Sequence, residues 1–186
     1  MSFDAKKAAH MSAYLLFQAG GAMNHMKLIK LLYLAERENL RRCGWFMSDD
    51  FLVSMPHGPV LSNTLYLINR DIDNSETWNQ LISEKINHTI SLKRDIQLKD
   101  LDELSVSDVE ILEDTWQKFG TKTQWELRDY THDPKNCPEW EDPGKGSKPI
   151  SLKTLLEEVG FSQDEAKALL KRMRDYGDID DFTASL

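Results

Sequence analysis

The sequence predicts an α+β fold that is mostly α-helical. We expect a helical core around one central apolar helix, a small antiparallel β-sheet or hairpin, and a helical hairpin at the carboxyl end. Apolar residues recur at helical spacing around most of residues 25–43, and apolar and polar residues alternate over residues 86–92. Several later segments begin with Ser or Thr three positions before an acidic residue, which is a signal for a helix start.

The segment from 25 to 43 is the predicted central helix. Its apolar residues surround most of the cylinder: Leu28, Ile29, Leu31, Leu32, Tyr33, Leu34 and Ala35. A helix that is apolar on nearly all sides is usually buried. We expect Asn24 to cap this helix and Gly44 to end it. An amphipathic helix is expected before it over residues 5–18, ended by Gly20 and Gly21.

The run Met55-Pro56-His57-Gly58-Pro59 contains two prolines, each of which lacks an N–H and disfavours helix in the preceding residue. We therefore expect a shaped loop that is neither helix nor regular strand. Pro59 suits the first position of a helix, so a third helix is expected from Val60 to about Ile68. A short strand is expected just before the loop, at residues 51–53.

The alternation over residues 86–92 predicts a strand, with residues 96–98 as its hairpin partner. A short helical segment containing Trp78, Leu81 and Ile82 is expected before it. Helices are expected after Ser107, with Glu110 completing a capping box, and after Thr123, with Glu126 doing the same. Residues 133–149 hold four prolines and two glycines, which predicts an irregular segment.

Two closing helices are expected at the carboxyl end. The first covers residues 152–159, and the second is opened by Ser162 with Glu165. We expect residues 1–150 to form one domain and residues 151–186 to be a helical hairpin with an acidic tail, packed on that domain.

The charge of the chain argues against nucleic acid as its main partner. The formal net charge is −8 and the isoelectric point is near 5.1. A phosphate backbone would be repelled by such a protein. The acidic residues concentrate at 100–114 and at 175–181. Most of them are expected to be solvated, although together they would also attract a basic partner protein.

The chain has two cysteines, Cys43 and Cys137, which are too few for a disulfide framework. Its first residues lack the continuous apolar run of a signal peptide or a membrane-spanning helix. We therefore expect a cytoplasmic protein that does not contact a membrane.

Sequence patterns for catalysis and metal binding are weak. His57 and His132 could act as acid and base, but no nucleophile motif, paired carboxylate motif or glycine-rich phosphate loop accompanies them. Cys43, His132 and Cys137 have separations that fit no zinc pattern. We expect a protein that is not an enzyme and that uses no cofactor or metal.

The two closing helices have the length and glycine turn of a helix-turn-helix. In that motif the first turn of the second helix faces the base edges. Here this turn is Gln163-Asp164-Glu165, and its two acids would repel DNA. An ordinary helical hairpin that covers the core is the preferred interpretation.

The chain resembles the Panacea domain, the SocA-like antitoxin family that also includes phage-associated GepA-like proteins. The resemblance covers about residues 24–140. It departs from the family at residues 36–38, where the family often has an aromatic residue. The first motif consists of Lys27, Leu28, Lys30, Leu31, Leu32, Tyr33, Gly44, Phe51, Met55, Gly58, Pro59, Val60 and Tyr66, and the second of Leu127, Thr131, His132, Pro138 and Trp140.

The resemblance implies the antitoxin of a toxin-antitoxin pair, which neutralises a cognate toxin by direct protein contact. We expect the toxin to be encoded next to it. A proteolytic adaptor that delivers a toxin to a protease is an alternative, as is a DNA-binding autoregulator that uses the carboxyl-terminal helices. A catalytic antitoxin or small hydrolase that uses His57 and His132 also stays open, as does a homo-oligomer.

Two shaped segments are the predicted toxin-binding surface: Met55, Pro56, His57, Gly58, Pro59 and Val60 with Thr131, His132 and Trp140. Alternatively, these residues only build the fold. The remaining motif residues are expected in the core: Lys27, Leu28, Lys30, Leu31, Leu32, Tyr33 and Tyr66.

Overall fold

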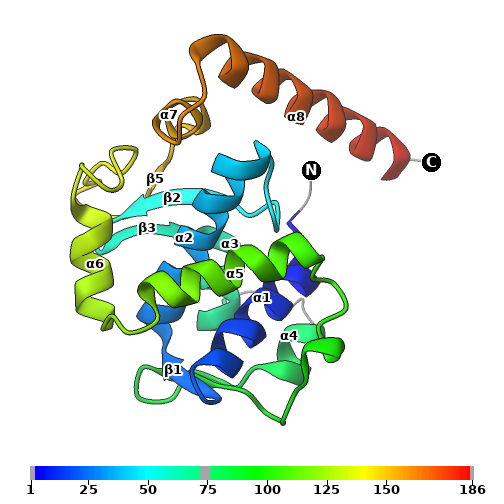
Figure 1. Ribbon diagram of the computed structural model, residues 1–186, viewed down its shortest axis with the longest axis vertical. Helices are drawn as coiled ribbons and strands as arrows, with labels where there is room; N and C mark the ends of the chain where they lie inside the picture. The colour runs from blue at the N-terminus through cyan, green and yellow to red at the C-terminus, as the bar shows by residue number, and fades with distance from the viewer. Residues whose placement is uncertain (1–2, 72–75, 185–186) are drawn as a thin grey trace.

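The computed structural model describes residues 3–71 and 76–184, and the side chains as far as residue 177. The chain forms an α+β fold that is mostly helical, as predicted (Figure 1). The elements are α1 (Ala5–Gln18), β1 (Ala22–Asn24), α2 (His25–Cys43), β2 (Leu52–Met55), β3 (Gly58–Leu61), α3 (Ser62–Asn69), α4 (Glu76–Leu81), β4 (Thr89–Ser91), α5 (Val106–Phe119), α6 (Gln124–His132), β5 (Lys148–Pro149), α7 (Leu152–Glu158) and α8 (Gln163–Ala184), with a 3-10 turn at Leu98–Asp100.

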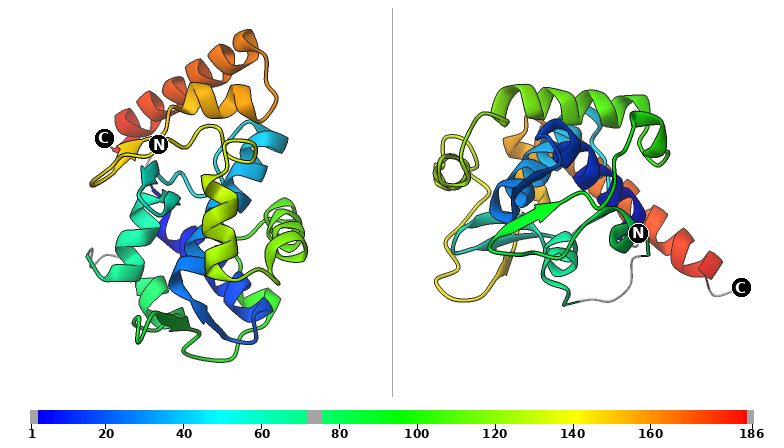
Figure 2. Two further views of the ribbon diagram at one scale, coloured as in Figure 1. Left: turned by 90° about the vertical axis from the view of Figure 1, so that its left-hand side faces the viewer. Right: turned by 90° about the horizontal axis from the view of Figure 1, so that it is seen from below.

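The helix α2 lies at the centre of the molecule. It packs against α5 on one side and against β3 on the other, and α1 and α6 also contact it (Figure 2). Its apolar residues from Leu28 to Ala35 are all buried. The predicted bounds are confirmed: the Asn24 side chain accepts a hydrogen bond from the N–H of Met26 at 2.9 Å, and Gly44 ends the helix in the left-handed conformation.

Several other predicted elements are confirmed. The helix α1 covers residues 5–18, and α4 contains Trp78 and Leu81. The capping box of Thr123 with Glu126 opens α6. At the carboxyl end α7 and α8 pack on each other, and the Ser162 hydroxyl donates to Glu165 at 2.7 Å at the start of α8. Figure 1 shows this helix pair at the end of the molecule opposite to β1.

The predicted loop at residues 55–59 is wrong, because this segment is a β-hairpin. The strands β2 and β3 pair antiparallel, with Ser54 opposite Pro59 and Met55 opposite Gly58. The sheet order is β3-β2-β5, so β3 is an edge strand. A proline is tolerated at a sheet edge because its missing N–H removes no necessary ladder bond. Pro59 therefore lies in β3, and α3 begins at Ser62 instead of Val60.

The predicted hairpin between residues 86–92 and 96–98 is also wrong. The strand β4 is limited to Thr89–Ser91 and pairs with β1, which is distant in sequence. Asn87 and His88 have positive φ angles of 49° and 64°, so they form a turn and shorten the strand. The segment that begins at Leu98 is a 3-10 turn instead of a strand.

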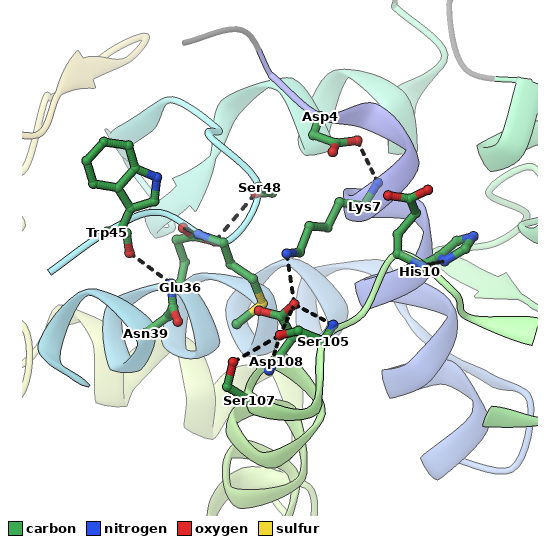
Figure 3. Close-up of polar contacts among 12 residues, drawn as sticks. Asp4, Lys7, His10, Glu36, Asn39, Trp45, Ser48, Ser105, Ser107 and Asp108 are labelled. Atoms are coloured by element: carbon green, nitrogen blue, oxygen red, sulfur yellow. Dashed lines mark hydrogen bonds and ion pairs between the residues drawn. The ribbon is translucent and has the colours of Figure 1, made fainter. Parts of the chain in front are cut away.

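The start of α5 lies two residues before the predicted one. The capping box uses Ser105 and Asp108 instead of Ser107 and Glu110. A tertiary contact accounts for this choice, because the Lys7 ammonium of α1 lies 2.8 Å from the Asp108 carboxylate (Figure 3). This partly buried ion pair favours Asp108 as the acid that closes the cap.

A buried carboxyl group attaches the loop after α2 to the helix. Glu36 is 0% exposed and accepts a hydrogen bond from the N–H of Met47 at 2.5 Å. The Ser48 hydroxyl donates to the same carboxyl at 3.4 Å, and the Asn39 amide donates to the Trp45 carbonyl at 2.8 Å (Figure 3). Burial raises the pKa of Glu36 to about 8, and the nearby Asp50 and Asp49 charges act in the same direction.

We predict that Glu36 makes stability fall as the pH rises. The folded-state pKa lies above the unfolded value of 4.5, so between these values the unfolded chain releases a proton that the folded protein retains. Each unit of difference contributes about 1.4 kcal/mol. The Glu36→Gln variant should therefore match the wild type near pH 4.5 and become increasingly more stable up to pH 8. Thermal melts of both proteins at several pH values between 4.5 and 8 test this prediction. A stability difference between the two proteins that does not change with pH would contradict it.

Candidate functional site

The tip of the β2–β3 hairpin meets the end of α6 and the segment after it. Figure 1 shows the hairpin turn beside α6. The Trp140 indole N–H donates to the Met55 carbonyl at 3.1 Å. The His132 ring stacks on the Trp140 ring with a centroid distance of 4.3 Å and an interplanar angle of 16°. The structure therefore brings together the two sequence motifs that were predicted to form one surface.

The predicted surface residues fall into two groups by exposure. Pro56 and His57 form the exposed turn, and Met55, His132 and Trp140 are half-buried beside it. We call these five residues the turn surface. The others are buried behind it: Gly58, Pro59, Val60 and Thr131. Among these nine residues, those of the turn surface are the most open to a partner.

Gly58 allows the hairpin to lie directly on the helices. Its φ angle is 93°, a conformation that L side chains rarely adopt. A Cβ atom at this position would lie 2.7 Å from Lys30 Nζ, 2.8 Å from Thr131 Oγ1 and 3.1 Å from His132 Cδ2. Both the backbone conformation and the close approach therefore require glycine here.

Lys30 supports the hairpin from below. Its Nζ donates to the Pro59 carbonyl at 2.8 Å, and the whole side chain is 1% exposed. Burial lowers the pKa of Lys30 to about 7. The residue was predicted to be in the core, and the structure confirms this, but its polar contact with the hairpin could not be foreseen from the sequence.

Other polar residues of α2 make similar contacts with distant segments. Lys27 Nζ donates to the Gly120 carbonyl at 2.6 Å, and the Tyr33 hydroxyl donates to Glu139 Oε1 at 2.5 Å. Arg37 Nε also donates to Glu139 Oε1, at 2.7 Å. Neither Arg37 nor Glu139 belongs to a sequence pattern that predicts this contact. The spacing of three or four residues between the polar positions of α2 was the available signal, since such positions share one helix face.

Tyr66 was predicted to be in the core, which is wrong. Its side chain is 45% exposed, because α3 buries Thr64, Leu67 and Ile68 instead. A helix places residues 64, 67 and 68 on one face and residue 66 away from it.

A small pocket lies beside the hairpin, between the first turns of α2 and the turn residues. Its volume is about 140 Å³. Its lining is mainly apolar and includes Met26, Ile29, Met55, Val60 and Leu65, together with Lys30 and the two histidines His25 and His57. The pocket is therefore continuous with the turn surface through Met55 and His57.

The chemistry available at the turn surface is limited. Burial lowers the pKa of His132, and the nearby Lys30 charge acts in the same direction. Its Nε2 is buried and, within residues 3–71 and 76–177, has no hydrogen-bond partner. Cys137 is buried, and burial raises the pKa of its thiol to about 12, so it packs as a small hydrophobic residue. In the described part of the chain, no three His, Cys, Asp or Glu side chains are placed to hold a metal ion.

The motif contacts agree with a comparison against protein families. The family model described as "Antitoxin SocA-like, Panacea domain" matches residues 28–141. The chain belongs to this family. No curated protein and no solved structure matches the chain significantly.

The match places the turn surface inside the Panacea domain. The matched range begins in α2 and ends just after Trp140, so it includes the hairpin, α5 and α6. The pair α7 and α8 lies outside the matched range. No helix in the described residues has the length and apolar character needed to cross a membrane.

We predict that Gly58→Ala destabilises the Panacea domain by about 2 kcal/mol or more, because strain at a positive φ is joined by a steric clash. Gly144→Ala is the matched control, since Gly144 also has a positive φ of 68° but has no atom within 4 Å of the added Cβ. Chemical denaturation of both variants measures the difference. Equal losses of stability would show that the close approach at Gly58 is not required.

Proposed function

We propose that this Panacea-domain protein is the antitoxin of a toxin-antitoxin pair and that it neutralises a cognate toxin by direct contact through the turn surface. The supporting observation is that an exposed turn, Pro56 and His57, lies within the matched region and is held by two distant segments. Membership of an antitoxin-like family also supports a role that is not enzymatic.

The contacts behind the turn suit it to binding. Trp140 and Lys30 each donate to a hairpin carbonyl, on opposite sides of the turn residues. A turn that is fixed before binding loses less conformational entropy when a partner docks. The aromatic ring of Trp140 also offers half-exposed apolar area next to the turn, which is typical of residues that dominate protein interfaces.

The charge of the protein supports a basic partner. A net charge of −8 would speed association with a basic toxin, while the shape of the turn surface would provide specificity. We expect the toxin to be encoded next to this protein and both to act in the cytoplasm. The first turn of α8 exposes Asp164 and Glu165, which argues against the alternative of DNA binding by this helix pair.

We predict that His57→Ala weakens toxin binding by about tenfold or more, as expected for a central interface residue. The toxin tested is the product of the adjacent reading frame, co-expressed with the antitoxin and scored by growth rescue and pull-down. Lys171→Ala on α8 is the control, because it also removes an exposed basic side chain. Both variants should keep the melting temperature of the wild type, since neither side chain is buried.

Equal binding by His57→Ala and the control would exclude the turn as the contact, while leaving the antitoxin role in place. A wild-type protein that neither rescues growth nor binds the neighbouring product would contradict the antitoxin role itself.

A further inference from the structure

We infer that the pocket beside the hairpin accepts a glutamate side chain of the toxin, whose carboxylate pairs with Lys30. This inference rests on the function proposed above and names the residue type that would anchor the complex.

The first observation is a buried lysine amine without a carboxylate partner. Lys30 is 1% exposed, and the only hydrogen bond of its Nζ in the described structure goes to the Pro59 carbonyl. An ammonium group has three donors, and because burial lowers the pKa of Lys30 to about 7, a carboxylate beside Nζ would favour its charged form. No described carboxylate lies within salt-bridge distance of Nζ or contributes to its pKa. A carboxylate from outside the chain would provide the missing partner.

The second observation is the charge of the pocket. The protein as a whole is strongly acidic, yet no Asp or Glu is among the described residues that line this pocket. Its titratable lining residues are Lys30, His25 and His57, none of which can carry a negative charge. The pocket therefore does not repel an anion, although the net charge of the protein is −8.

The size and the lining of the pocket favour a glutamate over other anions. A volume of about 140 Å³ is close to that of an engineered apolar cavity of about 150 Å³ that holds one benzene molecule. The walls formed by Met26, Ile29 and Leu65 suit the two methylene groups of a glutamate stem. A phosphate group has no apolar part that would fill the space between these walls.

The location of the pocket also fits a contact that begins at the turn. Met55 and His57 belong both to the turn surface and to the pocket lining. A toxin that covers the turn would therefore have the pocket within the same interface. Gly58, which also lines the pocket, lies directly over Lys30 and has no side chain that would screen it.

The first experiment uses a small probe with the full chain. N-acetyl-glutamate methylamide and its glutamine counterpart are titrated into the protein, and binding is followed by NMR shifts of the hairpin amides. We expect the glutamate probe to bind about fivefold or more tightly, because a charge-assisted hydrogen bond is stronger than a neutral one. Lys30→Met should remove this preference.

Lys27→Met is the matched control for the probe. Lys27 is on the same helix and also donates to a backbone carbonyl, but it does not line the pocket. It should keep the preference for glutamate. Equal binding of the two probes by the wild type, or no binding of either, would overturn the inference that the pocket recognises a carboxylate.

The second experiment uses the complex with the co-expressed toxin. Lys30→Met should weaken the complex by about tenfold or more, whereas Lys27→Met should not. One Glu→Gln substitution in the toxin should weaken it equally, and the two changes together should be no worse than either alone. The toxin substitutions give this result even if Lys30→Met fails to fold.

The outcomes separate this inference from the proposed function. A wild-type complex that is insensitive to Lys30→Met and to every toxin Glu→Gln change overturns the inference and keeps the antitoxin role. If the glutamate probe binds selectively in that case, the occupant is a free carboxylate instead of the toxin. If the wild type forms no complex, the antitoxin role and the toxin anchor fail together.

Discussion

The burial of α2 on nearly all sides is the constraint on which the rest of the structure depends. Over residues 28–36 this helix exposes almost no side-chain surface to water, so its buried polar groups find partners in the segments that cover it. Lys27 reaches the end of α5, Lys30 reaches the β2–β3 hairpin, and Tyr33 and Arg37 meet at Glu139. These contacts attach the outer segments to the core at fixed points.

The turn surface is a direct consequence of these attachments. Lys30 holds one strand of the hairpin and Trp140 holds the other, while Gly58 permits the backbone to approach the helices closely. Residues that build the site and residues that face solvent are therefore different members of one motif. The buried lysine is less favourable for stability than an apolar residue would be.

Local signals predicted much of the fold. Asn24 and Gly44 fixed α2, and Thr123 with Glu126 fixed the start of α6, because a cap satisfies backbone groups within a few residues. Local signals failed where a distant contact made the choice. Ser105 caps α5 in place of Ser107, and its capping-box partner Asp108 also forms an ion pair with Lys7 of α1. The strand at 89–91 found its partner in β1 instead of in the nearest apolar segment.

The sequence by itself determined the central apolar helix, most helix bounds, and a pair of motifs that identify the Panacea family. Only the tertiary structure decided that the run of two prolines is an edge hairpin, that Tyr66 faces solvent, and that Lys30 lies buried beneath Pro59. The physical reason is the range of the forces involved. Helix periodicity and caps act over a few residues, whereas strand pairing and the satisfaction of buried charges depend on which distant segments the folded core brings together.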